Sequence, residues 1–146
     1  MKTTHKLLIV IGCLATGIQA WAQQARLQDR LSLYNKVYDV FLEVDLGKQA
    51  LNVPGHDIYG PLAGYLGKSS NSFYWLVVSS EVKEQVATLQ LINDYGSEDL
   101  TATLSQTNDS TFQLTQQKGS SLKLPNKGKW QKLPKNLDFQ IRKPRK

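Results

Sequence analysis

The stretch YDVFLEVDL, residues Tyr38–Leu46, alternates apolar and mostly acidic side chains. Its apolar residues at every second position are Tyr38, Val40, Leu42, Val44 and Leu46. The intervening positions include Asp39, Glu43 and Asp45. Because successive side chains of a β-strand point to opposite faces of the sheet, this period of two predicts a strand with one buried face.

A second stretch, Ser72–Lys83, predicts the longest strand of the chain. One of its faces carries Phe73, Trp75 and Val77, and the other carries Tyr74, Leu76, Val78 and Val82. A strand that is apolar on both faces usually lies in the middle of a sheet or between two layers. We therefore expect Trp75 to be buried in the centre of the protein.

The remainder of the chain reads as short strands separated by turn residues. We expect a short helix in 23–33, a tight turn at 47–48, and strands in 49–53, 62–67, 86–93, 100–106, 111–117, 122–124 and 137–142. Eight or nine strands joined mostly by short turns favour an all-β antiparallel meander. Because open sheet edges invite aggregation, a long meander tends to close. The expected fold is an up-and-down barrel or half-barrel of lipocalin-like type, with a two-layer β-sandwich as the alternative.

The N-terminal segment has the pattern of a secretory signal peptide. Two lysines precede an apolar run that is too short for a membrane span, and Ala20-Trp21-Ala22 supplies small residues before a cleavage point. We expect cleavage after Ala22 and export to the periplasm or beyond. An alternative stays open, because Val10-Ile11-Gly12-Cys13 resembles the lipobox of bacterial lipoproteins, in which Cys13 carries a lipid anchor.

With cleavage after Ala22, the chain divides into a signal peptide (1–22), a single β-domain (23–142) and a short basic tail (143–146). The β-domain contains no cysteine, because Cys13 is the only one in the chain. Disulfides, cysteine nucleophiles and cysteine-ligated metals are therefore excluded for this domain. Its hydrophobic core alone must hold it together.

Charge is distributed unevenly along the chain. Residues 23–117 contain six basic and eleven acidic side chains, whereas residues 118–146 contain ten basic side chains and one acidic side chain. Either the basic strands lie beside acidic strands, where opposite charges attract, or they form a surface for anionic lipids or glycans. The residues expected to bind such anions are Lys127, Lys129, Lys132, Lys135, Arg142, Lys143, Arg145 and Lys146.

Catalytic and metal-binding patterns are weak. His56 is the only histidine in the expected β-domain, and no serine motif accompanies it, so we interpret it as a loop residue. Asp94, Glu98 and Asp99 form the densest acidic group, but their spacing fits a hairpin turn and does not match a calcium loop. We predict no enzyme activity, catalytic residue, metal or cofactor. A hydrolase built on scattered carboxylates stays as the weakest alternative.

Four aromatic residues are candidates for lining a ligand site: Tyr65, Phe73, Trp75 and Trp130. Packing in the core is the default role of such rings. Trp130 is the exception, because it stands among lysines, where an aromatic ring can stack on a base or a sugar. No nucleic-acid motif accompanies it, so we do not expect a nucleic-acid partner.

Two segments, INDYGSEDLTATL (92–104) and KWQKLPKNL (129–137), suggest a family likeness. Together with the strand pattern of 38–142, they resemble small exported, lipocalin-like all-β proteins of Gram-negative bacteria, a group without an assigned function. The resemblance implies an exported β-protein and supplies no catalytic residue.

These patterns together predict an exported, non-enzymatic binding protein of the cell envelope. Its partner would be a small apolar ligand inside the barrel, or an anionic lipid or glycan at the basic C-terminal end. The alternative is a structural or inhibitory envelope protein that acts on a protein partner. A hollow interior would favour the ligand, whereas a filled interior with an exposed apolar patch would favour the protein partner. The sequence leaves the oligomeric state open.

Overall fold

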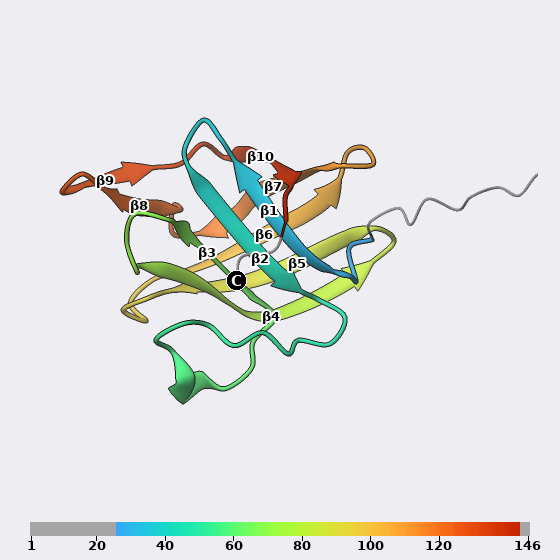
Figure 1. Cartoon of the computed structure of the whole chain (residues 1–146), viewed down its shortest axis with the longest axis horizontal. Coiled ribbons are helices and arrows are strands. Elements are labelled where there is room, and N and C mark those ends of the chain that lie inside the picture. The colour runs from blue at the N-terminus through green and yellow to red at the C-terminus, as the bar shows by residue number, and fades with distance from the viewer. Residues whose placement is uncertain (1–25, 144–146) are drawn as a thin grey trace, which may run out of the picture.

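The computed structural model describes residues 26–143, which form ten β-strands and one 3-10 helix (Figure 1). The strands are β1 (Arg30–Asn35), β2 (Val40–Asp45), β3 (Gly64–Lys68), β4 (Tyr74–Lys83), β5 (Val86–Asn93), β6 (Asp99–Gln106), β7 (Thr111–Gly119), β8 (Lys123–Asn126), β9 (Lys129–Lys132) and β10 (Asn136–Ile141). The helix η1 covers Asp57–Tyr59. The expected signal peptide and lipobox lie outside the described residues, as do Arg145 and Lys146.

Eight strands close into an antiparallel barrel. From β1 to β7 each strand pairs with the next along the chain, and β10 pairs with both β7 and β1 to complete the ring. The predicted up-and-down barrel is therefore confirmed, and the β-sandwich alternative is wrong. The two remaining strands, β8 and β9, pair with each other and form a separate hairpin beside the barrel.

One hydrophobic cluster with contributions from every barrel strand fills the interior. It includes the alternate residues Val40, Leu42, Val44 and Leu46, so the inner face predicted for 38–46 is confirmed. Trp75, Phe112 and Phe139 are fully buried in it, which also confirms the expected burial of Trp75. These bulky side chains occupy the space in which a hollow barrel would hold a ligand.

A second, smaller cluster lies on the outer face of the barrel. Its buried members are Phe41, Leu51, Val53, Tyr65 and Leu76. The outward-facing residues come from β2, β3 and β4, and the long β2–β3 connection, residues 46–63, covers them (Figure 1). This cover explains why β4 is apolar on both faces although it belongs to a single-layered barrel.

Two local predictions are wrong. Segment 49–53 is not a strand, because its ladder pairing is a single bridge between Leu51 and Leu62 and its apolar residues pack on the outer cluster. The helix expected in 23–33 is not present in the described part of that segment. There, β1 starts at Arg30 and pairs along both edges, with β2 and β10.

The acidic side of β2 is also less exposed than the alternation predicts. Glu43 and Asp45 are both buried. Glu43 forms an ion pair with Arg142, and the backbone N–H of Lys48 donates a hydrogen bond to Asp45. Polar partners on the outer face therefore allow these carboxylates to lie out of water.

Strand β4 changes face partway along its length. A β-bulge between Val77 and Ser79 shifts its register against β5. As a result Val78 is 38% exposed and Val82 packs against the inner cluster, whereas plain alternation places both valines on the outer face. The alternation is confirmed only up to Val77.

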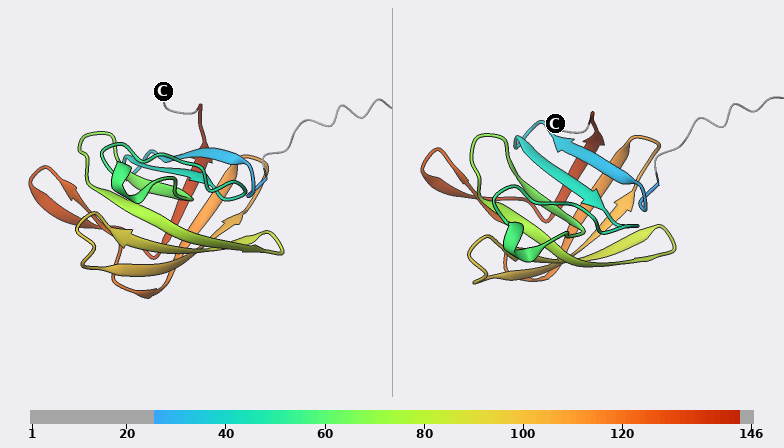
Figure 2. Two further views of the ribbon diagram at one scale, coloured as in Figure 1. Left: turned by 90° about the horizontal axis from the view of Figure 1, so that it is seen from below. Right: turned by 60° about the horizontal axis from the view of Figure 1, so that its bottom comes forward.

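The connections of an up-and-down barrel alternate between its two ends. The turns 36–39, 69–73 and 94–98 and the β8–β9 hairpin lie at one end, which we call the hairpin end. The turns 84–85 and 107–110 lie at the other end. Figure 2 shows the orange-red hairpin projecting beyond the barrel wall. Within residues 26–143, no helix has the length and apolar character needed to cross a membrane.

Candidate functional site

The β8–β9 hairpin is built by a two-residue turn and is anchored to the barrel by its apolar side. Lys127 and Gly128 both have positive φ, 51° and 79°, as in the tight turns that match the twist of paired strands. Leu124 reaches into the inner core, and the indole N–H of Trp75 donates a 2.9 Å hydrogen bond to the carbonyl of Lys123. The hairpin thereby covers one end of the filled barrel.

The hairpin gathers positive charge. Lys123 of β8 lies directly opposite Lys132 of β9, so the strands pair basic with basic. Like charges in this position repel, and pairing with acidic strands therefore does not account for the lysines of β8 and β9. Five lysines of the segment form no ion pair among residues 26–143. They are Lys118, Lys127, Lys129, Lys132 and Lys135.

A hollow of about 270 Å³ lies between the end of β7 and the end of β9. Its lining residues are Leu100, Gln116, Gln117, Lys118, Gly119, Ser120, Ser121, Lys132, Leu133 and Lys135. Three lysines and two serines thus line one space, and no Asp or Glu lines it. The backbone permits this shape because Gly119 has a φ of 101°, a conformation that favours glycine.

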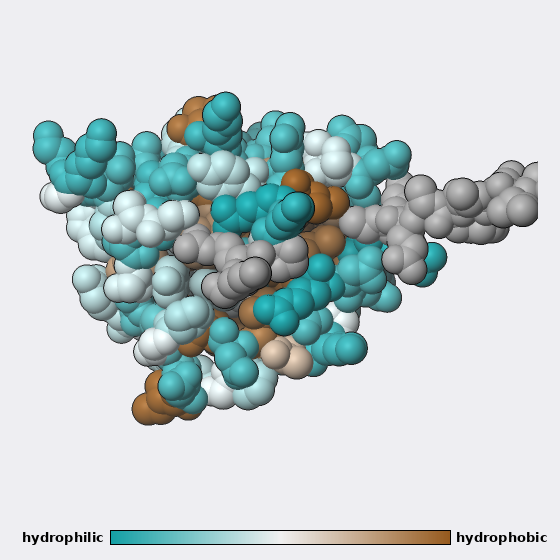
Figure 3. Space-filling view, in the orientation of Figure 1, coloured by the Kyte–Doolittle hydropathy of each residue, from teal (hydrophilic) through white to brown (hydrophobic). Residues whose placement is uncertain are grey.

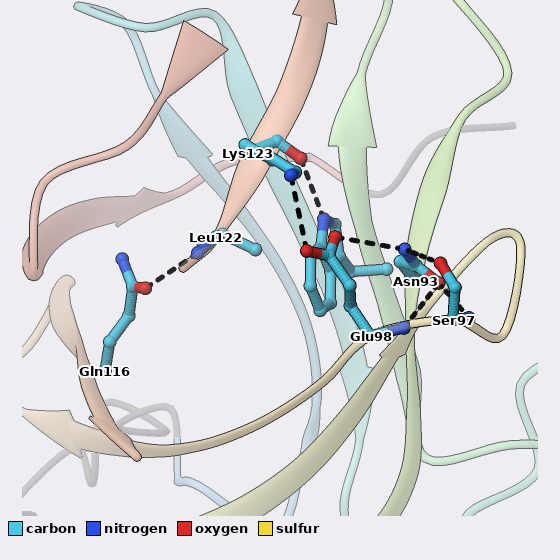
Figure 4. A network of polar contacts seen from close by, with 7 residues as sticks. Asn93, Ser97, Glu98, Gln116, Leu122 and Lys123 are labelled. Atoms are coloured by element: carbon cyan, nitrogen blue, oxygen red, sulfur yellow. Dashed lines mark hydrogen bonds and ion pairs between the residues drawn. The ribbon is translucent and has the colours of Figure 1, made fainter. Parts of the chain in front are cut away.

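Lys123 differs from the other lysines because it has a carboxylate partner. Its Nζ lies 3.3 Å from Oε1 of Glu98 and 5.8 Å from the ring centre of Trp130. The side-chain amide of Asn93 donates a hydrogen bond to the other oxygen of Glu98 and a second to Ser97 (Figure 4). This network ties the 94–98 turn to the base of the hairpin.

The acidic group of the 94–98 turn does not converge on one point. Asp94 contacts His56, Glu98 contacts Lys123, and Asp99 is exposed at the start of β6. Among the described residues, no group of three or more His, Cys, Asp or Glu side chains is arranged to hold a metal ion.

His56 has both ring nitrogens engaged. Nδ1 lies 2.9 Å from the carbonyl of Pro54, and Nε2 contacts a carboxylate oxygen of Asp94. Burial lowers the pKa of His56, but the Pro54 hydrogen bond, the hydrogen bond and charge of Asp94 and the charge of Asp57 together outweigh it, so the pKa is raised. Neither nitrogen is left to take a proton from a nucleophile in this arrangement.

Arg142 and Lys143, which were also predicted to bind anions, lie elsewhere. Arg142 is at the far end of β10, where its guanidinium pairs with Glu43 at 3.5 Å and stacks over the rings of Tyr34 and Phe41. Lys143 is exposed beside it. Arg142 therefore contributes to packing on the barrel wall, where the opposite-charge explanation of the basic segment does apply.

The four candidate aromatic residues do not form one site. Trp75 and Phe73 belong to the inner core, whereas Tyr65 packs in the outer cluster. Trp130 is about half exposed and its ring centre lies 5.1 Å from that of Phe73, in an edge-to-face contact. Tyr95 makes a similar contact with Phe73 at 5.2 Å, and the sequence patterns did not single it out.

Sequence reasoning also missed Lys118, Ser120 and Ser121. They flank Gly119 at the end of a strand, and only the folded chain brings them beside the lysines of β9 and the β9–β10 connection. A cluster of Lys, Ser and Gly in the sequence was the available signal, but the same composition is typical of any exposed turn.

The hairpin end thus combines lysine and serine residues around a hollow that no carboxylate residue lines. Hydrogen bonds from charged donors are strongest when the acceptor is an anion, so this arrangement has the chemistry of an anion site. Comparisons with protein-family models, with curated proteins and with solved structures found no match to this chain, so its function has to be inferred from these residues.

Proposed function

We propose that the protein is an exported, non-enzymatic binding protein that holds an anionic group of the cell envelope at its hairpin end. The observation that carries the proposal is the convergence of Lys118, Lys132 and Lys135 on one hollow without a carboxylate. Positive charge concentrated in a concave surface attracts anions and speeds their association. The export part of the proposal rests on the signal-peptide pattern of residues 1–22.

Other functions have less support. A ligand inside the barrel would have to displace packed side chains such as Trp75 and Phe112. A hydrolase centred on His56 would need a free ring nitrogen, and both nitrogens face oxygen acceptors. The anion site requires no rearrangement of the described residues.

A charge-matched pair of variants tests the proposal. The test variant is Lys118→Gln with Lys132→Gln and Lys135→Gln. Inorganic polyphosphate is titrated into each protein and the heat of binding is measured. We expect the dissociation constant to rise more than tenfold in the test variant, because each lysine near an anionic surface is worth about 1 kcal/mol. Binding by the unmodified protein should weaken as salt is added, because salt screens exposed charges.

The control removes the same amount of charge from the opposite end of the barrel. It combines Arg30→Gln, Lys48→Gln and Lys83→Gln, all of which are exposed residues. We expect it to bind polyphosphate within about twofold of the unmodified protein, because exposed charges farther away than the Debye length, about 10 Å at 0.1 M salt, are largely screened. Equal losses in the two triple variants would show that only net charge matters and would overturn the proposed site.

A further inference from the structure

Exposed apolar side chains gather at the hairpin end. Val37 is 84% exposed in the 36–39 turn, Ile58 is 90% exposed in η1, and Tyr95 is 73% exposed in the 94–98 turn. Trp130 of the hairpin and Tyr59 of η1 are each about half exposed. We call these five residues the apolar rim. At the opposite end, within the described residues, the exposed large apolar side chains are Val86 and Ile141, at only 40% and 37%.

Contacts join most of the rim into one structure. Tyr95 and Trp130 both pack edge-to-face on the buried ring of Phe73. On the other side, Tyr59 stacks on His56, whose ring contacts Asp94 beside Tyr95. Helix η1 lies in the β2–β3 connection, and this contact brings it to the hairpin end. The rim is therefore held in position from several elements.

The space-filling view shows how the rim projects. In Figure 3, brown hydrophobic surface protrudes at two separate places, where Figure 1 places the 36–39 turn and η1, and teal and pale surface lies between them and over the projecting tip of the hairpin. Isolated exposed apolar residues are normal on proteins, but several at one end indicate an interaction surface.

The charges around the rim favour an anionic partner. Lys36, Lys127 and Lys129 are exposed at this end, next to the lysine-lined hollow. Two nearby carboxylates have partners: Asp94 contacts the ring of His56, and Glu98 forms an ion pair with Lys123. Asp57 and Asp99 are exposed and oppose this field, as does the partly exposed Asp39 of the 36–39 turn, so the excess of positive charge comes from the hairpin side of the rim.

We infer that the anionic partner is the surface of a lipid bilayer, into which the apolar rim dips while the lysines contact the phosphate headgroups. This inference rests on the proposed function and adds the class of ligand. A soluble polyanion would gain nothing from projecting Ile58 and Val37. Tyrosine and tryptophan are the residues favoured at the boundary between hydrocarbon and headgroups, and lysine can reach from an apolar surface to phosphate.

Vesicle binding tests the inference. The protein is sedimented with vesicles of phosphatidylglycerol and phosphatidylethanolamine, and separately with vesicles of phosphatidylcholine alone. We expect binding to the anionic vesicles only, and a blue shift of tryptophan emission that disappears in Trp130→Phe. The rim variant Ile58→Ser with Tyr95→Ser should bind anionic vesicles about tenfold or more weakly, because burial of an exposed isoleucine accounts for roughly that factor.

Two controls separate this inference from the proposed function. Val78→Ser with Val86→Ser makes the same kind of apolar-to-serine change at two partly exposed positions away from the rim, 38% and 40% exposed, and should leave vesicle binding unchanged. The rim variant should bind polyphosphate as tightly as the unmodified protein and keep its thermal midpoint.

The possible results of the vesicle experiment distinguish the lipid inference from the proposed anion binding. Binding to polyphosphate without binding to anionic vesicles would overturn the lipid surface and leave a soluble polyanion or an acidic protein as the partner. Binding to neither would overturn the proposed function as well. Vesicle binding that survives unchanged in the rim variant would show that only the lysines act and would also overturn the inference.

Discussion

Trp75 shows how one residue joins the core of the barrel to its functional end. Its ring is fully buried among the inward-facing side chains, and its indole N–H is bonded to the carbonyl of Lys123 in the hairpin. A large ring buried at the hairpin end of the barrel interior fills space that a ligand would need there. The same ring also fixes the hairpin that carries the lysines.

Replacing Trp75 with alanine should lower the free energy of unfolding by about 3–5 kcal/mol, because the change leaves a large cavity and an unpaired carbonyl. Equilibrium unfolding in urea measures this loss. The comparison variant is Trp130→Ala, whose ring is about half exposed, and we expect a much smaller loss there. Equal stability of the Trp75→Ala variant and the unmodified protein would contradict the central position of this residue.

At the scale of elements, the 46–63 connection is the longest irregular segment of the described chain. Leu51 and Val53 pack it on the outer cluster, while His56 ties its tip to Asp94 in the 94–98 turn. The contact between His56 and Asp94 is polar and partly exposed, so protonation of His56 can change its strength. The position of η1, which carries Ile58, depends on this contact between His56 and Asp94.

The interaction between His56 and Asp94 should stabilise the fold more at low pH. The pKa of His56 is raised in the folded protein, so the stabilisation is fully present below its unfolded value of about 6.5 and is lost as pH rises through the folded value. We therefore expect the thermal midpoint of the unmodified protein to exceed that of His56→Asn most clearly near pH 5 and least above pH 8. Asp94→Asn should flatten the same pH dependence. A difference between His56→Asn and the unmodified protein that grows with pH would contradict this assignment.

At the scale of the whole molecule, the charge asymmetry of the chain becomes an asymmetry between parts of the structure. The lysines of 118–135 lie on the hairpin and around its base, with Lys118 at the end of barrel strand β7. Arg142 belongs to the same basic segment of the sequence but pairs with Glu43 on the barrel wall. The basic segment therefore has two roles, a lysine-rich surface at the hairpin and an ion pair on the barrel wall, and its composition does not distinguish them.

Export is the remaining expectation at this scale. Ala20-Trp21-Ala22 after a short apolar run predicts cleavage after Ala22, so intact-mass measurement of the exported protein should give a chain that starts at Gln23. A mass that corresponds to a chain starting at Cys13 with an attached diacylglycerol would instead show that the protein is a lipoprotein.

Much of the fold could be predicted from the sequence because strand alternation is a local property. The alternation in 38–46, and in 73–77, correctly predicted which side chains enter the core. Successive short strands separated by turn residues were sufficient for a meander that closes. The predictions failed where a local pattern had two explanations: the apolar residues of 49–53 pack on the outside of the barrel, and the bulge after Val77 moves Val82 to the inner face.

The sequence by itself determined the all-β class, the inward faces of the main strands and the excess of basic residues near the C-terminus. Only the tertiary structure decided that the barrel is filled, that Lys118 joins Lys132 and Lys135 around one hollow, and that Arg142 does not. It also brought Ile58 and Tyr95, which are far apart in the chain, to the same end as Trp130. The physical reason is that the alternation of apolar and polar residues and the charge of each residue are local properties of the sequence. A binding surface instead depends on which turns the closed barrel places together.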